Sequence, residues 1–191
     1  TQTGLYWRLG ADAESRIHVV FLCRCAPDPG AMVMSFEGLG SYKIGDTNMV
    51  ERGAMIPTTD PCEAPFKTAP ELDAQGVYFQ LKYESGGIKA DSPLAEIHVG
   101  GHLVSWNVES NLTTYGGAKI GMTFDEVRRR HPDLRFETKN GNGGPFEAGV
   151  IRSGEREMIF FSDWETESPK GSTPVVGMAV RDWSTDLYEG C

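Results

Sequence analysis

Apolar and polar residues alternate along two stretches of the chain. In the first, residues 97–106, two consecutive glycines divide the alternating run and predict a hairpin in which Val99 pairs with His102. Neighbouring side chains of a strand point to opposite faces, so Glu96 and His98 share one face, which we expect to be largely solvated. The apolar positions share the other face and are predicted to be core: Ile97, Val99, Val104, Trp106 and Val108.

The second stretch lies near the C-terminal end of the chain. Residues 149–152 and 157–161 flank Ser153-Gly154, a dipeptide typical of a tight turn, and predict a second hairpin. Residues 175–180 are almost entirely apolar and predict one further strand. The pattern therefore indicates antiparallel sheet in both halves of the chain.

One helix start is visible in the sequence. Thr123 precedes Glu126 by three residues, the spacing of a capping box, in which the hydroxyl and the carboxylate each bond a free amide of the first turn. Pro132 disfavours helical geometry in the residue before it, so the helix is predicted to end near His131. A short helix is therefore expected in front of the second hairpin.

The turn that enters this helix occurs twice. Lys43-Ile44-Gly45-Asp46-Thr47 returns as Lys119-Ile120-Gly121-Met122-Thr123, a shift of 120 − 44 = 76 residues. Longer segments recur at a shift of 81, and the loop at 140–145 accommodates the 81 − 76 = 5 extra residues. These segments are 78–84 with 159–165 and 92–99 with 173–180. Landmarks that recur in the same order predict an internal duplication.

The duplication predicts two modules. The expected divisions are an N-terminal extension at 1–37 with an edge-type strand at 16–22, a first module at 38–109, a second module at 112–183 and a C-terminal tail at 184–191. In the first module Thr47 starts a shorter helix, because Val50 replaces the glutamate and Gly53 follows closely. Each module is then a short helical segment packed on an antiparallel sheet, so the expected fold class is α+β.

Composition and charge narrow the class of protein. Of the 191 residues 39% are apolar, enough for one domain of ordinary size or two small modules. The formal charge of −9 opposes a nucleic-acid partner, for which clustered Lys and Arg are typical. No apolar run approaches the roughly eighteen residues of a membrane helix, so we expect no membrane span.

The cysteines bear on the cellular compartment in which the protein is expected. Four cysteines allow three pairings, and a bridge between Cys62 and Cys191 would tie the tail to the first module. Such a bridge is useful only in an oxidising compartment. Cys23 and Cys25 share one face if they lie in a strand, which suits a metal, two bridges or two unrelated small residues. The sequence begins without Met and without the regions of a signal peptide, which fits a mature secreted chain and a trimmed chain equally well. We expect a secreted or cell-envelope protein.

The helix entry resembles that of known families. Ile120-Gly121-Met122-Thr123-Phe124-Asp125-Glu126-Val127 matches the pattern (Val/Ile)-Gly-Met-Thr-x-x-x-Val, and Ile44-Gly45-Asp46-Thr47 matches it in part. With the tandem layout over about 38–183, the chain resembles the β-lactamase inhibitory proteins of actinobacteria and the small outer-membrane lipoprotein domains of the BamE/SmpA type. Gly38-Leu39-Gly40, Pro61-Cys62 and Glu189-Gly190-Cys191 also resemble secreted actinobacterial proteins of unassigned role. The resemblance implies a fold and an inhibitor-like role, and no binding residue is carried over from it.

Catalytic motifs are weak in this sequence. No Gly-x-Ser-x-Gly elbow occurs. Glu96, His98 and His102 come nearest to a metal cluster, but on the predicted hairpin the two histidines point to opposite faces. We therefore expect a protein that is not an enzyme and that needs neither cofactor nor metal.

Aromatic residues on a sheet face are the strongest candidates for function. If helices cover one face only, Tyr78 and Trp164 fall on the uncovered face by alternation, and His98 joins them there. We expect a non-enzymatic module that binds another protein, such as an extracellular enzyme, through this face and the hairpin tips. The alternatives are a metal-dependent enzyme with His98, His102 and His131 at the module junction, and a cell-envelope scaffold domain.

Overall fold

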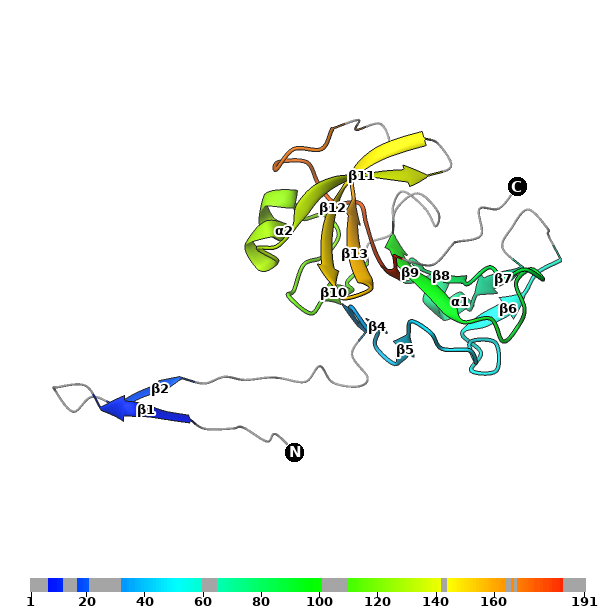
Figure 1. The fold of residues 1–191 in the computed structure, drawn as a ribbon, viewed down its shortest axis with the longest axis horizontal. Helices are drawn as coiled ribbons and strands as arrows, with labels where there is room; N and C mark the ends of the chain where they lie inside the picture. The colour runs from blue at the N-terminus through cyan, green and yellow to red at the C-terminus, as the bar shows by residue number, and fades with distance from the viewer. Residues whose placement is uncertain are drawn as a thin grey trace. The chain divides into compact units, whose positions relative to one another are not determined.

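The computed structural model describes residues 7–11, 17–20, 32–59, 65–100, 110–141, 144–163, 166 and 168–183 (Figure 1). The chain divides into two compact units, residues 1–31 and 32–191. In the first unit β1 (Trp7–Ala11) pairs antiparallel with β2 (Ile17–Val20), which lies within the strand expected at 16–22.

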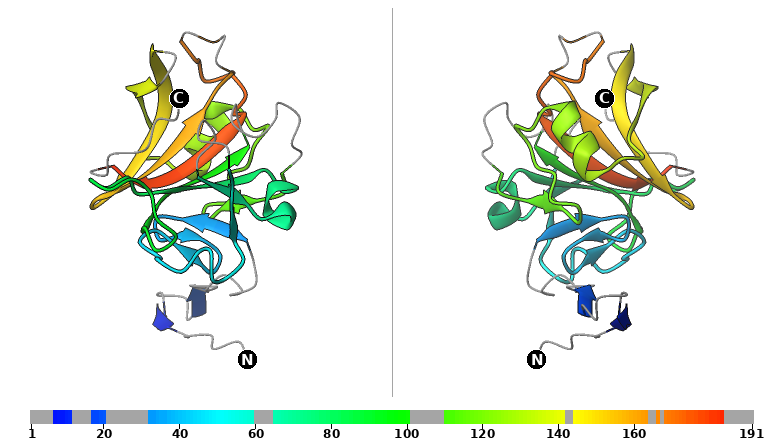
Figure 2. Two further views of the ribbon diagram at one scale, coloured as in Figure 1. Left: turned by 90° about the vertical axis from the view of Figure 1, so that its right-hand side faces the viewer. Right: turned by 90° about the vertical axis from the view of Figure 1, so that its left-hand side faces the viewer.

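A six-stranded antiparallel sheet is the main element of the second unit. Its strand order is β11-β12-β13-β14-β9-β8. The strands are β8 (Val77–Leu81), β9 (Leu94–Gly100), β11 (Arg135–Gly141), β12 (Gly144–Ser153), β13 (Arg156–Phe161) and β14 (Gly177–Asp182). Figure 2 shows the helix α2 (Phe124–Arg130) in front of this sheet in its right-hand view.

Smaller sheets complete the core. One has the order β10-β3-β4-β5, with β10 parallel to β3, and the other pairs β6 with β7. Their strands are β3 (Val33–Ser35), β4 (Gly38–Leu39), β5 (Tyr42–Lys43), β6 (Met55–Pro57), β7 (Phe66–Thr68) and β10 (Thr113–Thr114). Buried residues of these strands and of both helices join one hydrophobic cluster with one face of the large sheet. We call that face the inner face.

The α+β expectation is wrong, because the fold is mainly β. The described residues form fourteen strands and two helices, α1 (Pro70–Asp73) with four residues and α2 with seven. The helix expected after Thr47 is absent there, and residues 49–53 form turns. The amides of Ala54 and Met55 both bond back to the carbonyl of Met49, whose side chain is fully buried. This anchored turn ends at Gly53, which has φ +69° and stops helical propagation.

The second predicted helix is confirmed. Thr123 Oγ1 accepts from the amide of Glu126 at 3.3 Å, and Glu126 Oε2 accepts from the amide of Thr123 at 2.8 Å. The helix ends at Arg130, with His131 as its C-cap, as the following proline predicts. Phe124 and Val127 are fully buried and attach the helix to the inner face.

The two predicted hairpins have different outcomes. The second forms, since β12 and β13 pair up to Ser153 and Arg156 around a two-residue loop. The first falls largely on residues 101–109, which lie outside the described part of the chain. In the described part, Val99 pairs with Val77 on one edge of β9 and with Met178 on the other.

Hydrogen bonds recur at the shifts found in the sequence. The amide of Gly45 donates to the carbonyl of Leu94 at 2.7 Å, and the amide of Leu94 donates to the carbonyl of Asp46 at 2.8 Å. Shifted by 76 and 81 residues, the corresponding pair is Gly121 to Val175 and Val175 to Met122, both at 2.8 Å. Gly45 and Gly121 have similar positive φ values, +98° and +88°. The two turns are thus fixed to equivalent strand residues in the same way.

The strand register recurs as well. Four of the five partner pairs of β8 and β9, moved by 81 residues, coincide with partner pairs of β13 and β14, and the exception, Leu81↔Leu94, follows a register shift in β8. The matches are Val77↔Val99 with Met158↔Val180, Tyr78↔His98 with Ile159↔Ala179, Phe79↔Ile97 with Phe160↔Met178, and Gln80↔Glu96 with Phe161↔Gly177. The two strand pairs therefore have one register.

Candidate functional site

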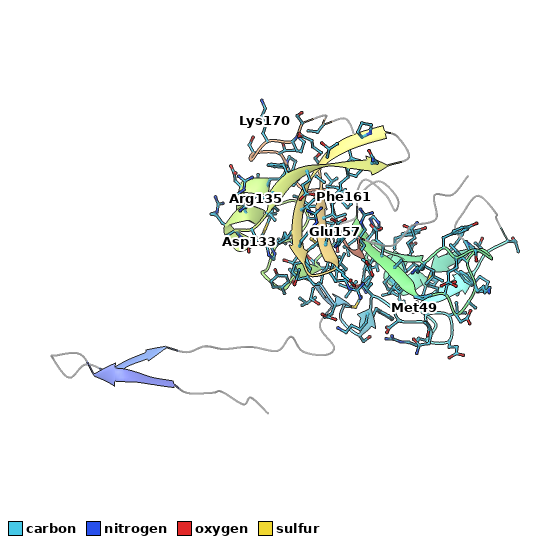
Figure 3. The ribbon with its side chains drawn as sticks, viewed as in Figure 1. Met49, Asp133, Arg135, Glu157, Phe161 and Lys170 are labelled. Atoms are coloured by element: carbon cyan, nitrogen blue, oxygen red, sulfur yellow. The ribbon has the colours of Figure 1, made fainter. Side chains whose placement is uncertain are left out.

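The face of the six-stranded sheet opposite the helices differs from the inner face in chemistry. We call it the outer face. Its apolar part is a small separate cluster, in which Phe146 and Phe161 pack on four buried residues, Ala148, Val150, Ile159 and Ala179. The rest of the outer face is aromatic or charged, and Figure 3 labels two of its members on β13, Glu157 and Phe161. The outer face is therefore the candidate functional site.

Four rings form a continuous aromatic set across the outer face: Tyr78, His98, Phe161 and Phe146. Tyr78 meets His98 edge-on at 6.2 Å between centroids, and His98 stacks on Phe161 at 5.8 Å and 16°. Phe161 meets Phe146 at 6.0 Å. All four residues are half-buried, so each ring keeps some accessible surface.

The stack depends on small residues in β14. His98 stands on β9 and Phe161 on β13, and β14 runs between these two strands. The residues of β14 that pair with them are Ala179 opposite His98 and Gly177 opposite Phe161. Because these side chains have one methyl group or none, the two rings can meet above the central strand.

A charged row runs parallel to the aromatic set. In register across the sheet it contains Arg152, Glu157, Arg181 and Glu96, with alternating sign. Glu157 is fully buried and accepts from Lys139 at 2.7 Å, from Arg181 at 2.8 Å and from Arg152 at 3.3 Å. Burial alone raises the pKa of Glu157, but the hydrogen bonds from Lys139 and Arg181 outweigh it and hold the pKa below its ordinary value. Glu157 is thus an ionised carboxylate enclosed by cations.

Glu96 has a different environment at the other end of the charged row. The residue is 2% exposed, and its Oε1 lies 2.5 Å from Nε2 of His98. Its Oε2 lies 3.8 Å from an Arg181 nitrogen, beyond hydrogen-bond distance. Among the described residues, this Oε2 is the buried side-chain oxygen without a hydrogen-bond partner.

His131 lies on the inner face, away from His98. It is 3% exposed, its Nε2 is 2.8 Å from Oγ1 of Thr114, and its ring lies 5.9 Å from that of Phe160. Burial, with a smaller contribution from Arg130, lowers the pKa of His131. Phe160 and Phe161 point to opposite faces of β13, so the structure separates the two histidines by the sheet.

The predicted site residues are partly brought together. Tyr78 and His98 lie side by side on the outer face, while Trp164, His102, Cys62 and Cys191 are outside the described residues. Sequence reasoning missed Phe146, Phe161 and the charged row. Period-two alternation along 157–161 places Glu157 and Phe161 on one face and could have found both.

The described part of the chain contains neither a membrane-spanning helix nor a metal-binding group of side chains. No helix there is long and apolar enough to cross a membrane. No group of three or more His, Cys, Asp or Glu side chains there is arranged to hold a metal ion. The site is accordingly described by its aromatic and charged side chains.

Comparison with known proteins gives a partial likeness. No family model and no solved structure matches the chain. Over 81 residues the chain is 38% identical to the isoleucine–tRNA ligases of Shewanella baltica strains OS155, OS185 and OS195. The match covers 42% of this chain and 8% of each ligase, so the chain spans a small fraction of the relatives it matches. The resemblance to the inhibitory proteins stays a prediction.

Proposed function

We propose that the chain is a non-enzymatic module that binds another protein through the outer face of its six-stranded sheet, as a secreted or cell-envelope, inhibitor-like protein. The observation that carries this proposal is the aromatic set. Partly exposed rings fixed by stacking present large contact area at little cost in conformational entropy, which is typical of protein-binding surfaces.

Comparison of the two copies also supports the outer face as the binding surface. We infer that the chain arose by duplication, since turn bonds and strand register both recur. At inward positions both copies are apolar: Val77 and Met158, Phe79 and Phe160, Ile97 and Met178, Val99 and Val180. At outward positions they differ: Tyr78 and Ile159, Gln80 and Phe161, Glu96 and Gly177, His98 and Ala179. Packing in the core keeps the inward positions apolar in both copies. The outward positions differ in residue type between the copies.

The charged row favours recognition over proton transfer. Lys139, Arg152 and Arg181 are bonded to carboxylates, so none is a free acid or base poised beside an empty site. A metal-dependent enzyme that used His98 and His131 together would need both on one face, and the sheet lies between them. The formal charge of −9 gives no support to a transfer-RNA partner.

A displayed peptide library selected on the immobilised chain tests this function. We expect enriched peptides whose affinity falls by about tenfold or more with Tyr78→Ala or Phe161→Ala. Tyr115→Ala is the matched control, because Tyr115 is 53% exposed and contacts Phe36 and His131 instead of the outer face.

Two results would contradict the proposal. One is a failure to enrich any peptide that the folded chain binds. The other is enrichment of peptides whose affinity is equal for the chain and for both outer-face variants. Displacement of bound peptide by bulk transfer RNA, added as a competitor, would instead favour a role related to the ligase likeness.

A further inference from the structure

The charged row has an unequal distribution of partners. Its carboxylates are Glu96 and Glu157 and its cations are Arg152 and Arg181, and β11 adds one carboxylate, Glu137, and one cation, Lys139, beside the row. Arg152 forms two bonds of 2.6 Å with Glu137, and all three cations donate to Glu157. At this end of the row, three cations therefore donate hydrogen bonds to only two carboxylates, Glu137 and Glu157.

One carboxylate oxygen of Glu96, at the other end of the row, has no hydrogen-bond donor among the described residues. Its Oε1 has His98, whereas its Oε2 is buried and accepts no hydrogen bond from the described residues. A buried carboxylate oxygen without a donor is strongly unfavourable, so such an oxygen normally accepts from an ordered water or from a bound group. The nearby Arg181 is already oriented by its 2.8 Å bond to Glu157.

The surroundings of Glu96 suit a positive group. Tyr78 and Phe161 flank His98, whose ring contacts Glu96, so aromatic rings line this part of the outer face. Aromatic rings attract ammonium and guanidinium groups, and a carboxylate offers them a charge-assisted hydrogen bond. The net charge of −9 attracts a basic partner at longer range.

We propose that the outer face recognises a cationic side chain of its protein partner, a lysine ammonium or an arginine guanidinium, which donates to Oε2 of Glu96. This inference rests on the proposed function, because it names the chemistry of the partner at that face. The aromatic set supplies the contact area, and Glu96 selects for a positive charge.

The test uses the full chain and two small probes, n-butylammonium chloride and N-methylguanidinium chloride, each compared with sodium chloride at equal ionic strength. NMR signals of the His98 ring and of the Arg181 side-chain Nε–H are followed. We expect saturable shifts with one or both organic cations and none with sodium. The two probes distinguish a preference for ammonium from one for guanidinium.

Variants locate the effect. Glu96→Gln should weaken probe binding by about tenfold or more, because the amide loses the charge that a cation requires. Glu71→Gln, at an exposed position of α1, should leave it unchanged. Equal shifts with sodium chloride, or binding that persists in Glu96→Gln, would overturn the proposal.

The wild-type titration makes the test independent of variant folding. If Glu96→Gln does not fold, shifts confined to His98 and Arg181 in the wild type support the site, and shifts centred elsewhere refute it. Probe binding also separates this inference from the proposed function. A probe that binds while no peptide is selected refutes the protein partner only, and selected peptides that lack Lys and Arg refute the cation site only.

Discussion

His98 pairs with Ala179 across β9 and β14, and the same two residues are equivalents of each other, since 179 − 98 = 81. The neighbouring pairs exchange in the same way: Ile97 pairs with Val180, and Val99 pairs with Met178. Ile97 thus faces the equivalent of Val99, and Val99 faces the equivalent of Ile97, which is the relation of an isologous contact in a twofold dimer. We infer a local twofold axis between His98 and Ala179, inside a single chain.

A substitution at Ala179, which lies beside this axis, tests whether the aromatic set depends on a small residue there. Ala179 is fully buried next to His98, so Ala179→Val should force the rings apart and destabilise the chain by about 1–3 kcal/mol. Urea unfolding followed by fluorescence measures the change. Ala90→Val, at an exposed position, is the control and should alter stability by less than about 0.5 kcal/mol.

The two recurring turns, at Thr47 and at Thr123, offer a matched test of helix capping. Thr123→Ala removes the hydroxyl that accepts from Glu126 and should cost about 1 kcal/mol of unfolding free energy. Thr47→Ala is the equivalent change in the first copy, where the residue is exposed and no helix follows, and it should be nearly neutral. Equal losses for both variants in urea unfolding would show that the capping box is not what stabilises α2.

His131 gives a pH dependence of stability. Its pKa is lowered in the folded chain from an ordinary value of 6.5, so the unfolded chain binds more protons between the two values. The contribution of His131 is therefore complete above about pH 6.5 and is lost as the pH falls towards the folded pKa.

Unfolding free energies measured across this window check the prediction. His131→Gln, which keeps a hydrogen-bonding group near Thr114, should remove the part of the slope that His131 contributes. A direct NMR titration that places the pKa of His131 at or above its ordinary value would contradict the sign.

Glu157 and Glu137 separate a buried carboxylate from a partly exposed one. Glu157→Gln leaves Lys139 and Arg181 without their anion and should destabilise the chain by about 2 kcal/mol or more. Glu137→Gln, at a side chain that is 29% exposed, should cost about 1 kcal/mol or less. Chemical unfolding at neutral pH compares the two, and a larger loss for Glu137→Gln would contradict the assignment of Glu157 as the centre of the row.

Local signals in the sequence predict much of this fold. The capping box at Thr123 and the short loop after Ser153 are decided by residues within four positions of one another, and both form as expected. Alternation around His98 also places that residue and Tyr78 on one face correctly.

Long-range pairing is what the sequence does not reveal. Val99 and its partner Met178 are 178 − 99 = 79 residues apart, so nothing near Gly100 shows that both edges of β9 are taken. The same holds for the charged row, because Arg181 reaches Glu157 only once β14 lies between β9 and β13. The missing first helix has a different cause, since the burial of Met49 prevails over a weak helix signal.

The pairing of β9 with β14 also has a consequence for synthesis. At about 5–20 residues per second, the 81 residues that separate equivalent strands take about 4–16 s to leave the ribosome. During that interval the first copy has an open strand edge at β9, the kind of edge that recruits other chains. The free edge of β9 is therefore covered only after β14 has been synthesised, and we expect a nascent chain to be most vulnerable to aggregation before β14 emerges.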